Sequence, residues 1–88
     1  MAAKARTKKT PAMMLWGMVA AEKQAQNLSN RELADLAGCS DGTVSLDANC
    51  PERIPLSRLF CYFAALGIDA ETVIRPIAQA YIDNLVAR

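Results

Sequence analysis

The chain has 88 residues, of which 52% are hydrophobic, and we expect one small domain without a separate catalytic or effector domain. Ten Lys and Arg nearly balance nine Asp and Glu, and histidine is absent. We expect no enzyme, because the sequence has no histidine, no glycine-rich phosphate loop and no cysteine arranged as a nucleophile. We expect no metal site and no cofactor, since Cys39, Cys50 and Cys61 lack C-x-x-C spacing and an obvious fourth ligand.

The cysteines and the hydropathy pattern also bear on the compartment. Three thiols without a disulfide framework are typical of a reducing cytoplasm. No stretch reaches the roughly 18 apolar residues of a membrane span, so no membrane partner is expected. The basic start followed by apolar residues has the outline of a signal peptide. Cleavage there would remove the first predicted helix, which makes this the weaker interpretation.

The positive charge is concentrated at the N-terminus. The first ten residues hold four of the ten cations and no acid, which leaves six cations against nine acids in the rest, a net charge of −3. Residues 1–9 are predicted to form a flexible basic arm. Two interpretations stay open: a solvated terminus, or an arm that contacts DNA phosphates through Lys8 and Lys9.

The first predicted helix starts at Thr10 and Pro11, as N-cap and first helical residue, and runs to about residue 26. One apolar stripe is expected to enter the core, with the methionines other than Met13 buried; it consists of Met14, Met18, Ala21 and Ala25, flanked by Leu15 and Val19. Trp16 lies off this stripe, which predicts a rim position or a contact with another chain.

Residues 29–49, SNRELADLAGCSDGTVSLDAN, carry the strongest local signals. Ser29 and Glu32 have the S-x-x-E spacing of a capping box that begins a helix. Gly38 supplies the left-handed conformation that ends it, and Ser40 begins a second helix with Val44 as its inward residue. Two short helices joined by a glycine turn have helix-turn-helix geometry, in which the second helix enters a DNA major groove.

The spacing of Ala34, Gly38 and Val44 resembles the helix-turn-helix of the phage-repressor (Cro and C1-type) superfamily. The stretch Ile54 to Asp69, IPLSRLFCYFAALGID, is similar to the helix ending in A-L-G-I/V that follows the motif in that family. The resemblance implies an all-α, five- to six-helix bundle with a central helix-turn-helix, whose DNA-binding core spans residues 10–69. It also implies a cytoplasmic bacterial protein similar to small plasmid- or phage-encoded (Kor-type) repressors.

The second motif helix is predicted over Asp41 to Leu46 or Ala48. At about 100° per residue, Thr43, Val44 and Asp47 share one side, and the opposite side is outward. Family members usually have an apolar residue where Asp47 stands, so we expect the helix to end near Leu46 and leave Asp47 in a turn. The outward side consists of Asp41, Gly42, Ser45, Leu46 and Asn49.

These positions supply candidate contacts of several kinds. Asp41 can accept a hydrogen bond from cytosine, short hydroxyls can donate to phosphates or base edges, and Asn49 can read adenine or cap a turn. Basic residues and the start of the following helix can contact phosphates. The candidate DNA contacts are Arg31, Ser40, Asp41, Gly42, Thr43, Ser45, Leu46, Asn49, Arg53, Ser57, Arg58, Lys8 and Lys9.

Two further helices are expected. The first starts at Pro55 and ends at Gly67, with Ser57 and Arg58 facing outward. Its buried apolar stripe is predicted to consist of Leu56, Leu59, Phe60, Phe63 and Leu66. Residues 70–88 form the last, capped by Asp69, in which Pro76 either kinks the helix or begins a new one. Its apolar face is wider than one small domain needs, which favours a twofold dimer contact through Ile77, Tyr81, Ile82 and Leu85.

The favoured function is a homodimeric, sequence-specific DNA-binding regulator, most simply a repressor that occludes a promoter at a near-palindromic operator. Its partners are double-stranded DNA and a second copy, with no small-molecule ligand expected. The alternative is a protein-interaction module on the same fold, such as an antitoxin or an adaptor. The acidic body and the acidic second motif helix favour this alternative.

Overall fold

Five α-helices and one short 3-10 turn make up the part of the chain that the structure describes. The computed structural model describes residues 9–86: α1 (Pro11–Ala25), α2 (Asn30–Ala37), α3 (Asp41–Asn49), η1 (Pro51–Arg53), α4 (Leu56–Leu66) and α5 (Ala70–Val86). Because no strand occurs among these residues, the predicted all-α bundle with a central helix-turn-helix is confirmed. Lys8 and most of the predicted basic arm lie outside the described residues.

The helix starts follow from local hydrogen bonds. Ser29 Oγ accepts from the Glu32 amide (3.1 Å) while Glu32 Oε1 accepts from the Ser29 amide (2.8 Å), so the predicted capping box is present. Thr10 and Ser40 cap α1 and α3 in the same way, accepting from the Met13 and Thr43 amides, each at 3.2 Å. These bonds satisfy amides that have no partner within the helix.

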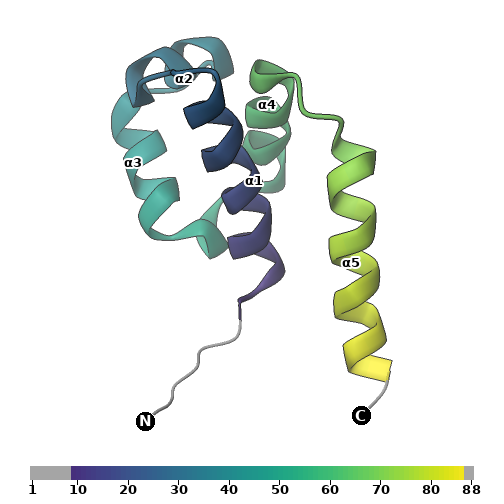
Figure 1. The fold of residues 1–88 in the computed structure, drawn as a ribbon. Coiled ribbons are helices and arrows are strands. Elements are labelled where there is room, and N and C mark those ends of the chain that lie inside the picture. The colour runs from purple at the N-terminus through teal and green to yellow at the C-terminus, as the bar shows by residue number, and fades with distance from the viewer. Residues whose placement is uncertain (1–8, 87–88) are drawn as a thin grey trace, which may run out of the picture.

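Gly38 ends α2 with φ of 81° and ψ of 32°, and its amide donates to the Ala34 carbonyl (2.8 Å). This left-handed conformation is open to glycine without strain. It reverses the chain within three residues, so that α3 packs beside α2 (Figure 1). Ala34, only 1% exposed, is the small side chain that allows the turn to lie against the core.

Gly38→Ala is expected to lower the free energy of unfolding by about 1–2 kcal/mol, because a Cβ is strained at positive φ. No atom lies within 4 Å of that Cβ, so the loss is purely conformational. The matched control is Gly17→Ala, also without a steric neighbour but inside α1. The control is expected to stabilise by about 1 kcal/mol. Urea unfolding of both variants measures the difference, and equal shifts would contradict the assignment.

Side chains of α1 to α4 form the core, whose buried apolar members are Val19, Leu33, Ala34, Val44, Leu59, Tyr62, Phe63 and Leu66. The predicted stripes were partly wrong. Met14 and Met18 are 40% and 42% exposed, and Leu56 and Phe60 are 63% and 46% exposed, although Met13 is exposed as expected. In both α1 and α4 the buried face is rotated about the helix axis relative to the predicted one. Two adjacent apolar stripes on a helix have the same periodicity, so the sequence does not show which of them is buried, and only the positions of the other helices decide it.

Trp16 illustrates the rotation of α1. It is half-buried on the inward face of the helix, and its ring meets Tyr62 edge-on, with centroids 5.5 Å apart and planes at 73°. Edge-to-face geometry is a favoured aromatic arrangement. Trp16 therefore lies at the rim of the core, which is one of the two predicted positions, and the contact with another chain stays a prediction.

The last helix, α5, runs through Pro76 without ending, so the prediction of a possible new helix at that point was wrong. The helix lies beside α1 at one side of the bundle (Figure 1). None of its described residues is buried, and Ala70, Val73 and Ile74, in its first half, are the residues that pack partly against the core. A 17-residue helix is thus attached along one side only.

Candidate nucleic-acid interface

The outward face of α3 is free of contacts that bury it. Asp41, Gly42, Ser45 and Asn49 are exposed and Leu46 is 66% exposed. On the opposite side Val44 is 0% and Asp47 2% exposed, and Thr43 is half-buried. The predicted division of the helix into two faces is confirmed.

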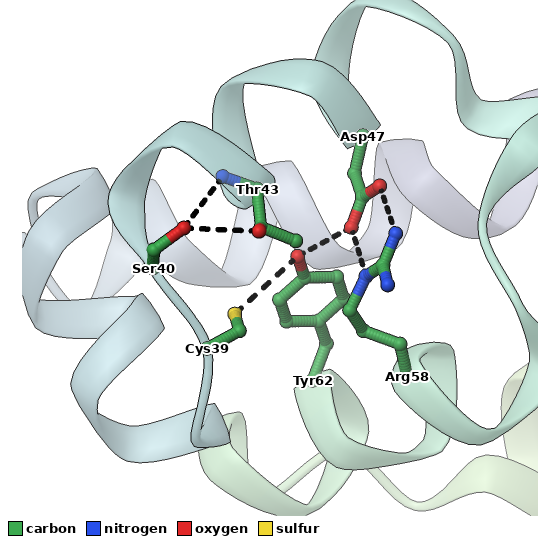
Figure 2. A network of polar contacts seen from close by, with 6 residues as sticks. All are labelled: Cys39, Ser40, Thr43, Asp47, Arg58 and Tyr62. Carbon is green, nitrogen blue, oxygen red and sulfur yellow. Dashed lines mark hydrogen bonds and ion pairs between the residues drawn. The ribbon is translucent and has the colours of Figure 1, made fainter.

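Asp47 does not lie in a turn, as predicted, but inside α3, which continues to Asn49. Its carboxylate accepts from Arg58 Nε (Oδ2, 2.7 Å), from Arg58 Nη2 (Oδ1, 2.7 Å) and from the Tyr62 hydroxyl (Oδ2, 2.6 Å; Figure 2). Three hydrogen bonds, two of them from a cation, stabilise the charge that burial would otherwise destabilise. An aspartate can therefore stand at an inward position and the helix need not end early.

The environment sets the ionisation of this cluster. Burial alone raises the pKa of Asp47, but hydrogen bonds from Arg58 and Tyr62 and the charge of Arg58 outweigh it, so the pKa lies below its ordinary value. The hydrogen bond to Asp47 raises the pKa of Arg58, and burial, followed by the bond to Asp47, raises the pKa of Tyr62. At neutral pH the cluster is a carboxylate held by a guanidinium and a phenol.

The cluster connects three elements. Asp47 belongs to α3, Arg58 and Tyr62 belong to α4, and Cys39 Sγ in the turn between α2 and α3 lies 4.0 Å from the Tyr62 hydroxyl (Figure 2). Arg58 was expected to face outward. Its side chain is only 31% exposed and two of its nitrogens are held by Asp47, so that expectation was wrong.

Several candidate hydroxyls already have partners within the protein. Ser40 Oγ accepts from the Thr43 amide and shares a hydrogen bond with Thr43 Oγ1 (3.0 Å; Figure 2). Ser45 Oγ accepts from Asn30 Nδ2 at 3.4 Å, a contact between α2 and α3. Ser40 and Thr43 thus serve first as the cap of α3, and Ser45 keeps an exposed hydroxyl with one weak partner.

The candidate cations are distributed around α3 and none lies on it. Arg53 is exposed in η1, Ser57 is exposed in the first turn of α4, and Lys9 is exposed before α1. Arg31 lines a depression of about 250 Å³ that is also lined by Asp35 and Asp41. No ion pair joins Arg31 to Asp35 in the described structure, where the two salt bridges are Asp47–Arg58 and Glu71–Arg75.

The four residues expected at a dimer contact lie from the middle of α5 to its C-terminal end. Tyr81, Ile82 and Leu85 are 49%, 49% and 51% exposed, and Ile77 is half-buried. Met14 and Met18 on the neighbouring α1 are also exposed, so apolar surface is present on both helices.

Tyr62 and Asn30 are residues of this region that the sequence analysis missed. Tyr62 lies three residues after Leu59, which was predicted to be buried, so helix periodicity would have placed Tyr62 in the core as well. Its hydroxyl needed a buried partner, and Asp47 was not expected to be buried. The bond from Asn30 to Ser45 joins residues 15 positions apart on separate helices, and no spacing rule predicts such a pair.

No family model, curated protein or solved structure matches this chain. Within residues 9–86, no group of three or more cysteine or acidic side chains is placed to hold a metal ion. None of the described helices has the length and apolar character needed to cross a membrane.

Proposed function

We propose that this protein is a homodimeric, sequence-specific DNA-binding regulator that represses by occluding a promoter at a near-palindromic operator. One observation carries the proposal: α3 presents a row of small and short polar side chains outward while its inner side is fixed by Val44 and by the bonds of Asp47. A helix of about 10–12 Å diameter with such a face fits a major groove about 12 Å wide.

Each outward residue has a chemical role in this proposal. Asp41 accepts from a cytosine amino group, Ser45 donates to or accepts from a base edge, and Asn49 pairs with adenine. Leu46 contacts a thymine methyl group, and Gly42, which has no side chain, allows close approach of the helix. Because α3 carries no arginine, bidentate recognition of guanine is not part of the proposed readout.

Phosphate contacts are proposed for exposed groups around α3. Arg53 and Ser57 follow α3 directly in the chain, Arg31 precedes it, and Lys9 extends the surface before α1. Ser40 and Thr43 lie at the α3 start, and Lys8 belongs to the arm outside the described residues. Phosphate contacts fix orientation and affinity, whereas the outward face of α3 supplies the sequence preference.

A second copy is proposed to pack on the apolar face of α5 around Ile77, Tyr81, Ile82 and Leu85. A twofold interface repeats the same patch on both subunits, so an exposed apolar helix face is suited to it. Two copies of α3 would then read half-sites about 34 Å apart on one side of the duplex.

Selection of bound sequences from a random duplex pool, followed by titration of the selected duplex at several salt concentrations, tests this function. A recovered sequence with twofold symmetry and a steep fall of affinity with salt are expected, because each neutralised phosphate contributes about −0.9 to the slope of log affinity against log salt. Recovery of no preferred sequence together with a flat salt dependence would rule the proposal out.

Variants separate phosphate contacts from base readout. Arg53→Ala is expected to weaken binding to all duplexes alike and to reduce the salt slope by about 0.9 per protomer. Ser45→Ala and Asp41→Ala are expected to change the preferred base by about 1–3 kcal/mol of discrimination. Arg75→Ala, which removes an exposed cation from α5, is the control and should change neither quantity. Fluorescence anisotropy with the selected duplex and single-base variants of it measures both effects.

The second candidate function is a protein-interaction module. The observation that favours it is the outward face of α3 itself, which has the acidic Asp41 at one end, the 66% exposed Leu46 in the middle and no cation. Such a face would fit a partner with an apolar pocket beside basic residues. Salt-independent behaviour toward DNA in the titration above would favour this candidate over the regulator.

A further inference from the structure

A second polar hollow lies beside α3, at the end of the helix opposite Asp41. It has a volume of about 300 Å³ and lies between the last turn of α1, the start of α2 and Ala48 of α3. Its polar lining consists of Lys23, Gln24, Asn27 and Asn30, and Trp16 and Leu28 are among its apolar walls. One basic residue and three residues with side-chain amides therefore line one surface depression.

The two hollows that border α3 differ in charge. The hollow of Arg31 is lined by two acidic residues, Asp35 and Asp41, against one basic residue. The hollow of Lys23 contains one cation and no carboxyl group among the described residues that line it. The charge balance therefore favours an anion more at the second hollow than at the first, and side-chain amides can donate hydrogen bonds to its oxygens.

The hollow is coupled to the outward face of α3. Asn30 lines it and at the same time donates through Nδ2 to Ser45 Oγ. Ala48, which lines it from α3, lies one turn beyond Ser45 and is exposed. A group bound in the hollow would therefore lie next to the bases that Ser45 is proposed to read.

We infer that the Lys23 hollow binds a phosphodiester of the duplex backbone, with Lys23 supplying the charge and Asn30 joining this contact to Ser45. This inference rests on the proposed DNA binding and names where one strand of the backbone lies. A helix inserted in a major groove has a strand of backbone on each flank, so α3 requires phosphate contacts beside it because it has no cation of its own.

The test compares Lys23→Ala with Arg31→Ala and with Arg75→Ala, each titrated with the selected duplex at 50 and 200 mM salt. In a dimer, each such substitution removes two phosphate contacts. The factor by which affinity falls between 50 and 200 mM salt then becomes roughly tenfold smaller than in the wild type. We expect this reduction for Lys23→Ala, a smaller effect for Arg31→Ala and none for Arg75→Ala. The sequence preference of Lys23→Ala should be unchanged, whereas Asn30→Ala should also alter the preference at the base that Ser45 reads.

The outcomes separate this inference from the proposed function. A wild-type protein without salt-dependent binding would remove the DNA-binding proposal itself. A wild-type protein with a steep salt dependence that Lys23→Ala leaves unchanged would overturn the hollow alone.

Trp16 is the only tryptophan and lines the hollow, so its fluorescence reports occupation. We expect a change on adding duplex and none with 10 mM inorganic phosphate. A saturable change with inorganic phosphate, abolished in Lys23→Ala, would identify a site for small free anions and overturn the assignment to the DNA backbone.

Discussion

Arg58→Met is expected to destabilise the fold by about 3 kcal/mol, because it leaves the carboxylate of Asp47 buried without its cation. In a domain of this size such a loss lowers the melting temperature by roughly 12–24 °C. Arg58→Lys keeps the charge but not the two parallel hydrogen bonds, and its loss should be intermediate. Thermal unfolding followed by circular dichroism measures all three proteins.

The same variant has a defined pH dependence. In the wild type the pKa of Asp47 is below its ordinary value, so its contribution is present above the unfolded pKa, near 3.9, and is lost as pH falls through the folded pKa. Without Arg58, burial raises the pKa above the unfolded value. The difference in free energy of unfolding between the wild type and Arg58→Met is then largest at neutral pH and becomes smaller as pH falls toward 4.

Two controls make this prediction specific. Arg75→Met breaks an exposed pair, in which the side chains are 73% and 71% exposed, and should change stability by at most about 0.5 kcal/mol. The double variant Asp47→Leu with Arg58→Met leaves no charge buried and should be more stable than Arg58→Met alone. A double variant as unstable as the single one would show that the uncompensated charge is not the cause.

Tyr81→Asp is expected to convert dimers into monomers, because it places a charge in the centre of the proposed α5 contact. The affinity for a duplex with two half-sites should then fall to the affinity for a single half-site. The reason is that the two recognition helices are no longer linked, so binding of the first does not raise the effective concentration of the second. Sedimentation equilibrium over a range of protein concentrations measures the first effect, and anisotropy with full and half-site duplexes measures the second.

The control for Tyr81→Asp is Gln79→Glu, which adds a negative charge to the same helix about 200° around its axis. Gln79 is exposed and its partner Asp83 is on the same helix, so this change should leave the dimer intact. A Tyr81→Asp protein that still sediments as a dimer would place the contact between copies away from this face of α5.

The parts of the fold that depend on a few neighbouring residues could be predicted from the sequence. The capping box of Ser29 and Glu32, the turn at Gly38 and the outward side of α3 all arise from spacings of three to six residues. Local hydrogen bonds and helix periodicity determine such features, and both are visible in one sequence.

The parts that depend on other helices could not be predicted in the same way. Asp47 was assigned to a turn because an apolar residue was expected at that inward position, and the two partners that allow its burial are 11 and 15 residues away on α4. Met14 and Met18 were assigned to the core because their spacing matches that of Leu15 and Val19. In both cases the residue pattern allowed two answers, and the packing of α4 against α1 and α3 decided between them.

The attachment of α5 has a consequence for how such a chain can diverge. Among the described residues, all eight buried apolar side chains come from α1 to α4, and α5 adds only partly buried side chains from its first half, so the second half of this 17-residue helix can change without removing a buried side chain beneath α3. Under the proposed function, substitutions that change which copies associate therefore fall in a different segment from those that change which bases are read. Duplicated genes for a protein working as proposed would lose cross-pairing through α5 alone, while each product would keep its original target.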